Sequence, residues 1–243
     1  MKKAEMKRTR TRRAAPRLPL VSSGRSRRAS AAAGPGHDTP YHHGALRDAL
    51  LEAAERVLER DGLPGLTLRA VAREAGVSHA APTHHFGDLT GLLSELAAIG
   101  YRRFTAALGA ARAAATLPNE KGLASAKAYL RYARAHPGMY GLMFRTERLD
   151  MARPSLREAA DDSFASFAGA IGAERREQIP AETLTLQQAG ALTHAWSLVH
   201  GFTTLLLDGR LIKILRQLPE GTDPETLLVA MLMSSIGRPQ GAA

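Results

Sequence analysis

Residues 67–86 read TLRAVAREAGVSHAAPTHHF, and this stretch decides the local fold. Thr67 is placed to cap a short helix, because a threonine oxygen accepts backbone N–H groups of the first helical turn. Gly76 follows that helix as a turn residue that tolerates positive φ, and Val77 is left to pack under the turn. Ser78 is then placed to cap another short helix that ends near Phe86. Helix, tight turn and helix in this order predict a helix-turn-helix unit.

The segments on both sides of this unit are also predicted to be helical. Apolar residues recur at helical spacing between His43 and Arg60, and the glycines and proline of residues 61–65 end that helix. Asp88 is placed to cap a long helix whose apolar residues are Leu92, Leu93, Leu96, Ile99, Tyr101, Phe104 and Leu108. We therefore expect one domain at residues 41–88 and a larger helical domain at residues 89–243.

The composition predicts the fold class. Leucine and alanine far outnumber valine and isoleucine, which favours helices over strands. We expect an all-α protein with an N-terminal three-helix helix-turn-helix unit and a larger C-terminal helical bundle, about nine helices in all. The absence of cysteine from the 243 residues excludes disulfides, thiolate zinc sites and a cysteine nucleophile.

The basic charge belongs to the N-terminal tail. The chain carries a formal net charge of +10. Residues 1–40 hold eleven Lys or Arg and only two acids, Glu5 and Asp38, so the tail accounts for +9. Its prolines and its Ser/Gly/Ala-rich run predict a disordered basic tail. A transit peptide and a start site placed too early, with translation beginning at Met6, are alternative interpretations.

The helix-turn-helix segment resembles the DNA-binding segment of the TetR family of bacterial transcriptional regulators. The match runs from about residue 43 to residue 104, and it includes Leu51-Glu-Ala-Ala54 and Leu66-Thr67-Leu68 upstream of the turn. The predicted caps, turn glycine, buried valine and terminal phenylalanine fall in register with the family. The resemblance implies that the helix after Ser78 enters the major groove of DNA.

The resemblance implies a set of DNA-binding residues. Small side chains let a recognition helix approach base edges, and a helix start offers hydroxyl and N–H groups to a phosphate. The set consists of Thr67, Arg69, Ser78, His79, Ala80, Ala81, Thr83 and His84. Two positions depart from the family, which usually has tyrosine in place of Thr83 and lysine near Leu89. The unit is therefore expected to bind DNA more weakly or to rely on the basic tail for phosphate contacts, and a degenerate recognition helix is the alternative interpretation.

The C-terminal half carries a second resemblance. Residues 129–144, with a break at His136-Pro137-Gly138, resemble a subgroup of TetR-type regulators, and Trp196, His200 and Gly201 fit that subgroup's Trp-His-Gly signature. The family often encloses a small-molecule pocket. The candidate lining residues are Tyr140, Met143, Phe144, Trp196 and His200. Ordinary helix core is the alternative interpretation of this set.

Three further helices are predicted near the C-terminus. One covers Pro154 to about Arg176 and presents Leu156, Ala160, Phe164, Phe167 and Ile171 on one face. The others cover about Ala181–Leu207 and Pro224–Ile236. The resemblance implies that segments 184–207 and 224–236 form a dimer interface, with Leu205, Leu228 and Leu232 as candidate contacts.

An enzymatic function is not expected. The spacings between His79 and His84 and between His194 and His200 do not place two imidazoles on one helix face. No nucleotide-binding, zinc-protease or serine-hydrolase motif occurs, and the pair Asp161-Asp162 is interpreted as surface charge. We expect no catalytic residues, no metal and no cofactor.

The expected function is a cytoplasmic bacterial regulator of transcription, associated with the nucleoid when bound. The longest apolar stretches are shorter than a membrane span needs, so no membrane partner is expected. The resemblance implies a homodimer that binds a palindromic operator on double-stranded DNA and responds to a small-molecule effector, more often as a repressor. The alternative is a basic nucleic-acid-associated helical protein without operator specificity.

Overall fold

A computed structural model describes residues 41–236, and within them it contains helices joined by loops and no strands. This confirms the all-α prediction, with ten α-helices where about nine were expected. They are α1 (Tyr41–Gly65), α2 (Leu68–Ala75), α3 (Ala81–Phe86), α4 (Leu89–Ala114), α5 (Lys121–Ala135), α6 (Pro137–Met143), α7 (Pro154–Arg175), α8 (Leu186–Leu207), α9 (Ile212–Leu215) and α10 (Pro224–Ile236). The predicted basic tail, residues 1–40, lies outside the described residues.

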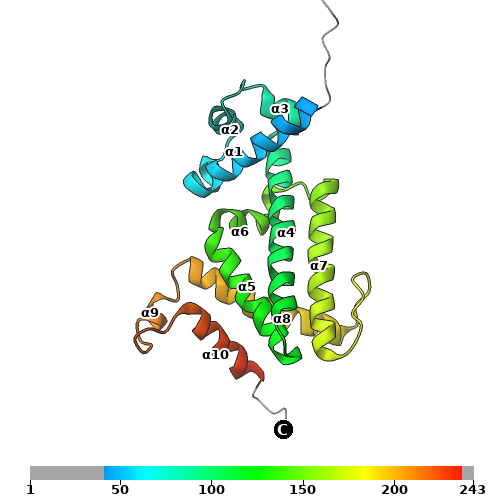
Figure 1. Cartoon of the computed structure of the whole chain (residues 1–243), viewed down its shortest axis with the longest axis vertical. Coiled ribbons are helices and arrows are strands. Elements are labelled where there is room, and N and C mark those ends of the chain that lie inside the picture. Colours follow the sequence, from blue (N-terminus) through cyan, green and yellow to red (C-terminus); the bar gives the residue numbers. More distant parts are fainter. Residues whose placement is uncertain (1–40, 237–243) are drawn as a thin grey trace, which may run out of the picture. The chain divides into compact units, whose positions relative to one another are not determined.

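Helix α4 connects the two halves of the fold. Its first turns pack against α1 and α3, and the rest of the helix packs against α5, α6 and α7, as Figure 1 shows. As predicted, Asp88 caps α4, with its carboxylate accepting the N–H of Gly91 at 2.8 Å. Gly100 allows α6 to approach closely, because a β-carbon there would lie 2.8–2.9 Å from the side chains of Met139 and Met143.

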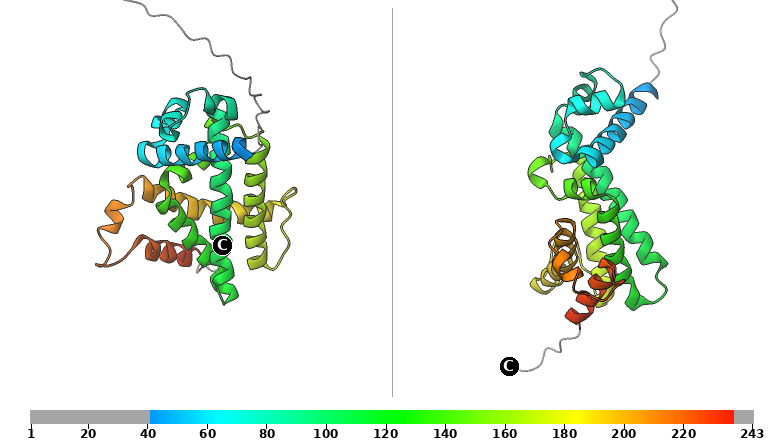
Figure 2. Two further views of the ribbon diagram at one scale, coloured as in Figure 1. Left: turned by 45° about the horizontal axis from the view of Figure 1, so that its top comes forward. Right: turned by 90° about the vertical axis from the view of Figure 1, so that its left-hand side faces the viewer.

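The largest apolar core lies between α1, α2, α4, α5 and α6. Leu50, Val57 and Leu96 have no exposed surface, and Leu92 and Met143 are equally buried. Helices α8 and α10 pack against each other and against α5, and in the left view of Figure 2 α8 runs across the direction of α4 and α7. Their shared core is much smaller and consists of Ala126, Leu130, Phe202, Leu211 and Leu228.

Two sequence predictions for the C-terminal helices are wrong. Helix α8 begins at Leu186 rather than near Ala181, because Thr185 and Gln188 form a capping box at that point. Phe164 is 37% exposed rather than internal. The buried residues of α7 are Leu156, Ala159, Ala168 and Gly172, so only Leu156 of the predicted face is buried.

No helix in the described part of the chain is both long enough and apolar enough to cross a membrane.

Candidate nucleic-acid interface and effector site

The turn between α2 and α3 has the predicted geometry. The N–H of Ala70 donates to Oγ1 of Thr67 at 3.1 Å, which confirms Thr67 as the cap of α2. Gly76 ends the helix in the left-handed region (φ 68°), where a side chain would be strained. The N–H of Val77 then donates to the carbonyl of Ala72 at 3.0 Å. These local bonds fix the direction in which α3 leaves the turn.

Helix α3 starts two residues later than predicted, since a cap at Ser78 would place its first residue at His79. Ser78 does not cap it: its hydroxyl accepts the N–H of Ala80 at 3.3 Å within a turn, and α3 begins at Ala81. Pro82 causes no break because it lies in the first turn of the helix, where its missing N–H has no helical partner to lose. The predicted end at Phe86 is confirmed.

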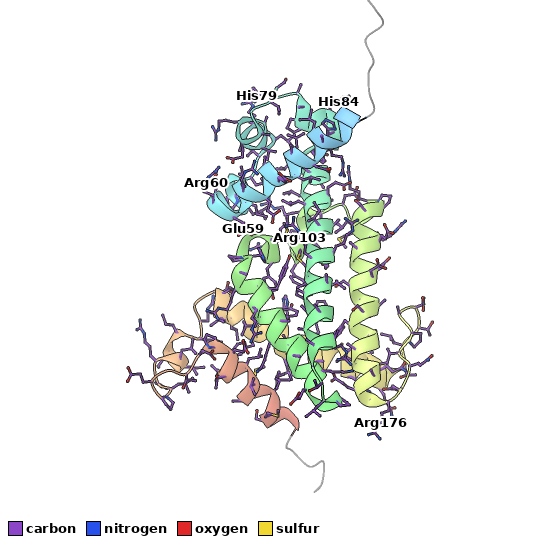
Figure 3. All side chains as sticks on the ribbon, viewed as in Figure 1. Glu59, Arg60, His79, His84, Arg103 and Arg176 are labelled. Atoms are coloured by element: carbon purple, nitrogen blue, oxygen red, sulfur yellow. The ribbon has the colours of Figure 1, made fainter. Side chains whose placement is uncertain are left out.

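The predicted DNA-binding residues lie together around the turn and α3. Most of their side chains are exposed, namely those of Thr67, Arg69, Ser78, His79, Ala80, Thr83 and His84. Ala81 is half-buried and packs against the core, so it supports α3 rather than lying fully on its open face. In Figure 3, His79 and His84 lie at the free edge of the helix-turn-helix unit, away from α8 and α10.

Acidic charge near this face is neutralised by α1. Arg56 and Arg60 donate to the two carboxylate oxygens of Glu74 at 3.0 and 2.9 Å. Hydrogen bonds from Arg60 and then Arg56 hold the pKa of Glu74 below its ordinary value. Within residues 41–236 neither Arg69 nor Arg73 on the same helix has an ion pair, so α2 offers a positive surface beside α3.

An ion-pair network holds α1, α4 and α7 together behind α3. Arg47 lies over the Phe86 ring, 5.5 Å from its centroid, and binds Glu95 at 2.5 Å. Arg153 donates to the other oxygen of Glu95 at 2.8 Å. Burial raises the pKa of Glu95, but the hydrogen bonds from Arg153 and Arg47 outweigh burial and hold it below its ordinary value. Sequence spacing gave no signal for this network, because its members lie far apart in the chain.

A second polar cluster lies in the C-terminal domain. Nδ1 of His200 is 2.8 Å from the hydroxyl of Tyr129 and 2.9 Å from that of Tyr140, and the two hydroxyls are 3.3 Å apart. These residues come from α8, α5 and α6. Burial raises the pKa of both tyrosines and lowers the pKa of His200. The cluster is therefore an uncharged hydrogen-bonded group at neutral pH.

The predicted pocket residues surround this cluster but differ in burial. Tyr140 and Met143 are buried, Phe144 is half-buried, and Trp196 is 48% exposed. The rings of Phe144 and Trp196 lie 4.7 and 6.0 Å from the His200 ring, centroid to centroid. Tyr129 belongs to the same group and was not among the predicted residues. Only the folded arrangement of α5 beside α8 brings it there.

Helix α6 is tied directly to α1. Glu59 accepts the backbone N–H groups of Gly138 and Met139 at 3.3 and 3.2 Å. A carboxylate at a helix start satisfies N–H groups that have no helical partner. Figure 3 places Glu59 and Arg103 where α1 meets the C-terminal helices. The helix that carries Tyr140 is thus bonded to the helix-turn-helix unit, a link that the sequence did not predict.

An apolar groove of about 370 Å³ lies along α8, α9 and α10. Its lining residues are Ser197, Leu198, Gly201, Phe202, Leu205, Leu211, Ile214, Leu227 and Met231. Of the predicted dimer contacts, Leu205 lines the groove and is 43% exposed, and Leu232 is half-buried. Leu228 has no exposed surface and belongs to the core of the protomer. A substitution at Leu228 would therefore test that core and not a partner contact.

Acidic and imidazole side chains do not gather into a metal site in the described ranges: no group of three or more His, Asp or Glu there is arranged to hold an ion.

Two family models match the chain. Residues 50–96 match the model described as bacterial regulatory proteins, tetR family, and residues 123–233 match the model described as tetracyclin repressor-like, C-terminal domain. A solved structure from Rhodococcus sp. RHA1, of a protein of unknown function, is 34% identical and covers 81% of this chain and 96% of its own, with a TM-score of 0.63.

Two further comparisons cover the fold and the N-terminal region. A TetR-family transcriptional regulator from Pectobacterium atrosepticum is 20% identical, covers 82% of this chain and 94% of its own, and has a TM-score of 0.56, a likeness of fold. The HTH-type transcriptional regulator BetI of Burkholderia mallei (strain NCTC 10229) is 40% identical over 70 residues. Those residues are 29% of this chain and 36% of BetI, so the match spans about a third of that curated relative.

Proposed function

This chain belongs to the TetR family of bacterial transcriptional regulators, and we propose that it is a ligand-responsive repressor that binds a palindromic operator as a homodimer. The observation that carries the proposal is the exposed face formed by His79, Thr83 and His84 on a locally fixed turn. We expect no enzymatic activity, because a regulator of this kind acts by binding DNA. Its place of action is then the bacterial cytoplasm, where the DNA lies.

Each part of the exposed face has a distinct role in DNA binding. His79, Thr83 and His84 are polar and exposed, so they are the candidates for base readout in the major groove. Ser78 and the small Ala80 let the backbone of the turn come close to base edges, and Ala81, half-buried against the core, supports α3. Thr67 and Arg69 lie at the start of α2 and are placed for phosphate contacts. The DNA-binding domain is residues 41–88 in this proposal, and residues 89–243 form the regulatory domain.

The groove of α8–α10 supports dimerisation through a second copy. Leu205, Leu207 and Met233 expose 37–53% of their surface on these two helices. Exposed apolar side chains in one contiguous region mark an interaction site more often than single ones do. A two-fold axis there would place two α3 helices on successive major grooves, about 34–36 Å apart. The homodimer is thus the partner state that we propose.

The aromatic cluster around His200 supports the effector-sensing part. Tyr140 lies on α6, and α6 is bonded to α1 through Glu59. A ligand that separates Tyr140 from His200 would act on the helix that contacts the DNA-binding unit, and would favour a dimer that releases DNA. The residues Trp196, His200 and Gly201 support membership of the Trp-His-Gly subgroup, which we also propose.

The deciding experiment is a selection of bound sequences from random duplex DNA with the full chain. We expect a palindrome with half-sites one helical turn apart. A protein that only associates with nucleic acid would return no palindrome and would bind all sequences with the same dependence on salt. That outcome would favour the alternative function and contradict the proposal.

A further inference from the structure

His200 presents one polar atom that has no partner. Both tyrosine hydroxyls of the cluster are at Nδ1, so Nε2 makes no hydrogen bond with any described residue. Nε2 is also absent from the set of buried polar atoms that lack a partner, which is Thr105 Oγ1, Ser155 Oγ and Thr203 Oγ1. Nε2 therefore reaches solvent. The imidazole is held from one side by the tyrosines and is open on the other.

The open side of His200 has aromatic neighbours. Phe144 lies edge-on to the imidazole at 4.7 Å between centroids, and Trp196 lies 6.0 Å from it and 6.5 Å from Phe144. Trp196 is 48% exposed although the other large aromatic residues of the cluster are buried or half-buried. Edge-to-face packing around a ring is favourable at centroid distances of about 4.5–7 Å. These neighbours suit a planar aromatic ligand.

The site lacks charged side chains. Burial alone lowers the pKa of His200, with no contribution from a charged neighbour. The pKa of Tyr140 is raised by burial first, and the opposing hydrogen bonds come from Tyr129 and Thr204. A carboxylate brought to this position would lose hydration without gaining a cation. The chemistry of the site thus favours an uncharged ligand.

We propose that the effector is an uncharged aromatic compound that carries one hydroxyl group, a phenol, bound at Nε2 of His200 against the Phe144 and Trp196 rings. A hydroxyl both donates and accepts, so it satisfies Nε2 in either tautomer of the imidazole. The aromatic ring replaces water against the Phe144 and Trp196 rings. Only the regulatory consequence of binding rests on the proposed function, because the binding itself is measured without DNA.

The test compares three ligands of equal ring size at pH 7: p-cresol, toluene and 4-methylbenzoate. Trp196 is the only tryptophan of the chain, so its fluorescence reports the site, and calorimetry gives the affinity. We expect p-cresol to quench Trp196 and to bind about ten-fold more tightly than toluene, the equivalent of one hydrogen bond. We expect 4-methylbenzoate to bind more weakly than p-cresol by at least the same factor.

Other outcomes overturn the proposal. Equal binding of toluene and p-cresol would remove the hydrogen-bonding role of Nε2, and tighter binding of 4-methylbenzoate would show a charged site. If none of the three binds, the cluster is a packed core and not an effector site. None of these results bears on the random-duplex selection, so the failure of the effector class and the failure of operator binding are distinguishable.

Two matched variants sharpen the test. His200→Phe removes the polar atom, and we expect it to abolish the ten-fold preference for p-cresol over toluene. His194→Phe makes the same change six residues earlier on α8 at an exposed position, and we expect it to keep the preference. Retention of the preference in His200→Phe would contradict the assignment. If His200→Phe does not fold, the comparison of ligands on the unmodified chain still decides.

Discussion

The helix-turn-helix unit and the α8–α10 region bury their apolar residues to very different degrees. In the first, Leu50, Val71 and Phe86 expose 0–3% of their surface. In the second, Leu205 and Met233 expose 43% and 53% although both lie on helices rich in apolar residues. The first region completes its core within one protomer. The second has a core of only five buried residues and leaves an apolar groove open.

This difference separates two roles of apolar residues. The buried apolar residues of the helix-turn-helix unit hold α3 in one orientation. Sequence-specific binding of DNA requires such a fixed orientation. The apolar residues of α8 and α10 exceed what one protomer buries, and burying them against a second copy would gain about 25 cal/mol per Å² of apolar surface before the costs of association. The stability of the two regions should therefore respond differently to dilution and to substitution.

The largest expected effect follows from placing charge on the exposed apolar side chains of α8 and α10. Leu205→Glu combined with Met233→Glu places two carboxylates on the exposed apolar faces of α8 and α10, where a second copy would desolvate them. We expect a monomer and a loss of operator affinity of at least about 100-fold, because only half-site contacts remain. Sedimentation and operator titration measure the two effects.

Phe164→Glu is the matched control for the double variant of Leu205 and Met233. Phe164 is 37% exposed on α7 and does not line the groove, so we expect this variant to stay dimeric with unchanged operator affinity. An unmodified chain that sediments as a monomer at micromolar concentration would contradict the contrast between the two regions.

A smaller and more selective effect is expected in the helix-turn-helix unit. His79→Ala and His84→Ala remove exposed polar side chains without changing the core. Each should relax the base preference at particular positions, where a mismatch costs about 1–3 kcal/mol. Selected sequences from random duplex DNA provide the measurement, with His194→Ala as a control on α8. Identical sequence preferences for all four proteins would remove these histidines from the readout surface.

The features that were predicted correctly from the sequence are those that depend on hydrogen bonds between residues close together in the chain. The Thr67 cap, the left-handed Gly76 and the end of α3 at Phe86 each depend on residues within a few positions of one another. The same holds for α10, whose predicted bounds match the structure. Ser78 is the exception among the caps, because a local turn competes with a cap for the same hydroxyl group.

The parts that the sequence missed join residues far apart in the chain. Tyr129 lies 71 positions from His200, and Glu59 lies 80 positions from Met139. Periodicity within one helix cannot reveal which helix packs beside it. The exposure of Phe164 was missed for the same reason, since the spacing of apolar residues along α7 does not show which of them a neighbouring helix covers.

A third prediction concerns the bond that joins α1 to α6, the helix whose Tyr140 lies beside His200 of α8. Glu59→Gln weakens the capping of α6 by α1, because an amide accepts the N–H groups of Gly138 and Met139 less strongly than a carboxylate. We expect a loss of about 0.5–1 kcal/mol in the free energy of unfolding. Glu52→Gln, seven residues earlier on the same exposed side of α1, is the control and should change it little. Equal losses in both variants would show a general charge effect rather than a specific cap.

The smallest expected effect is a pH dependence of stability that belongs to the C-terminal region alone. Burial lowers the pKa of His200 in the folded protein, so the unfolded chain takes up its proton first as the pH falls through the ordinary histidine value of about 6.5. The contribution of His200 to the free energy of unfolding is therefore full above that pH and decreases below it, until the folded protein is protonated as well.

The free energy of unfolding should change by well under about 1.4 kcal/mol per pH unit, the limit for one proton, because solvent screens a half-buried imidazole. Urea unfolding between about pH 7.5 and 5.5 measures it, and His200→Gln should show a shallower decrease than both the unmodified chain and His194→Gln. A decrease of the same size in all three proteins would assign the pH dependence to other histidines and would leave the cluster around Tyr129 and Tyr140 insensitive to protons.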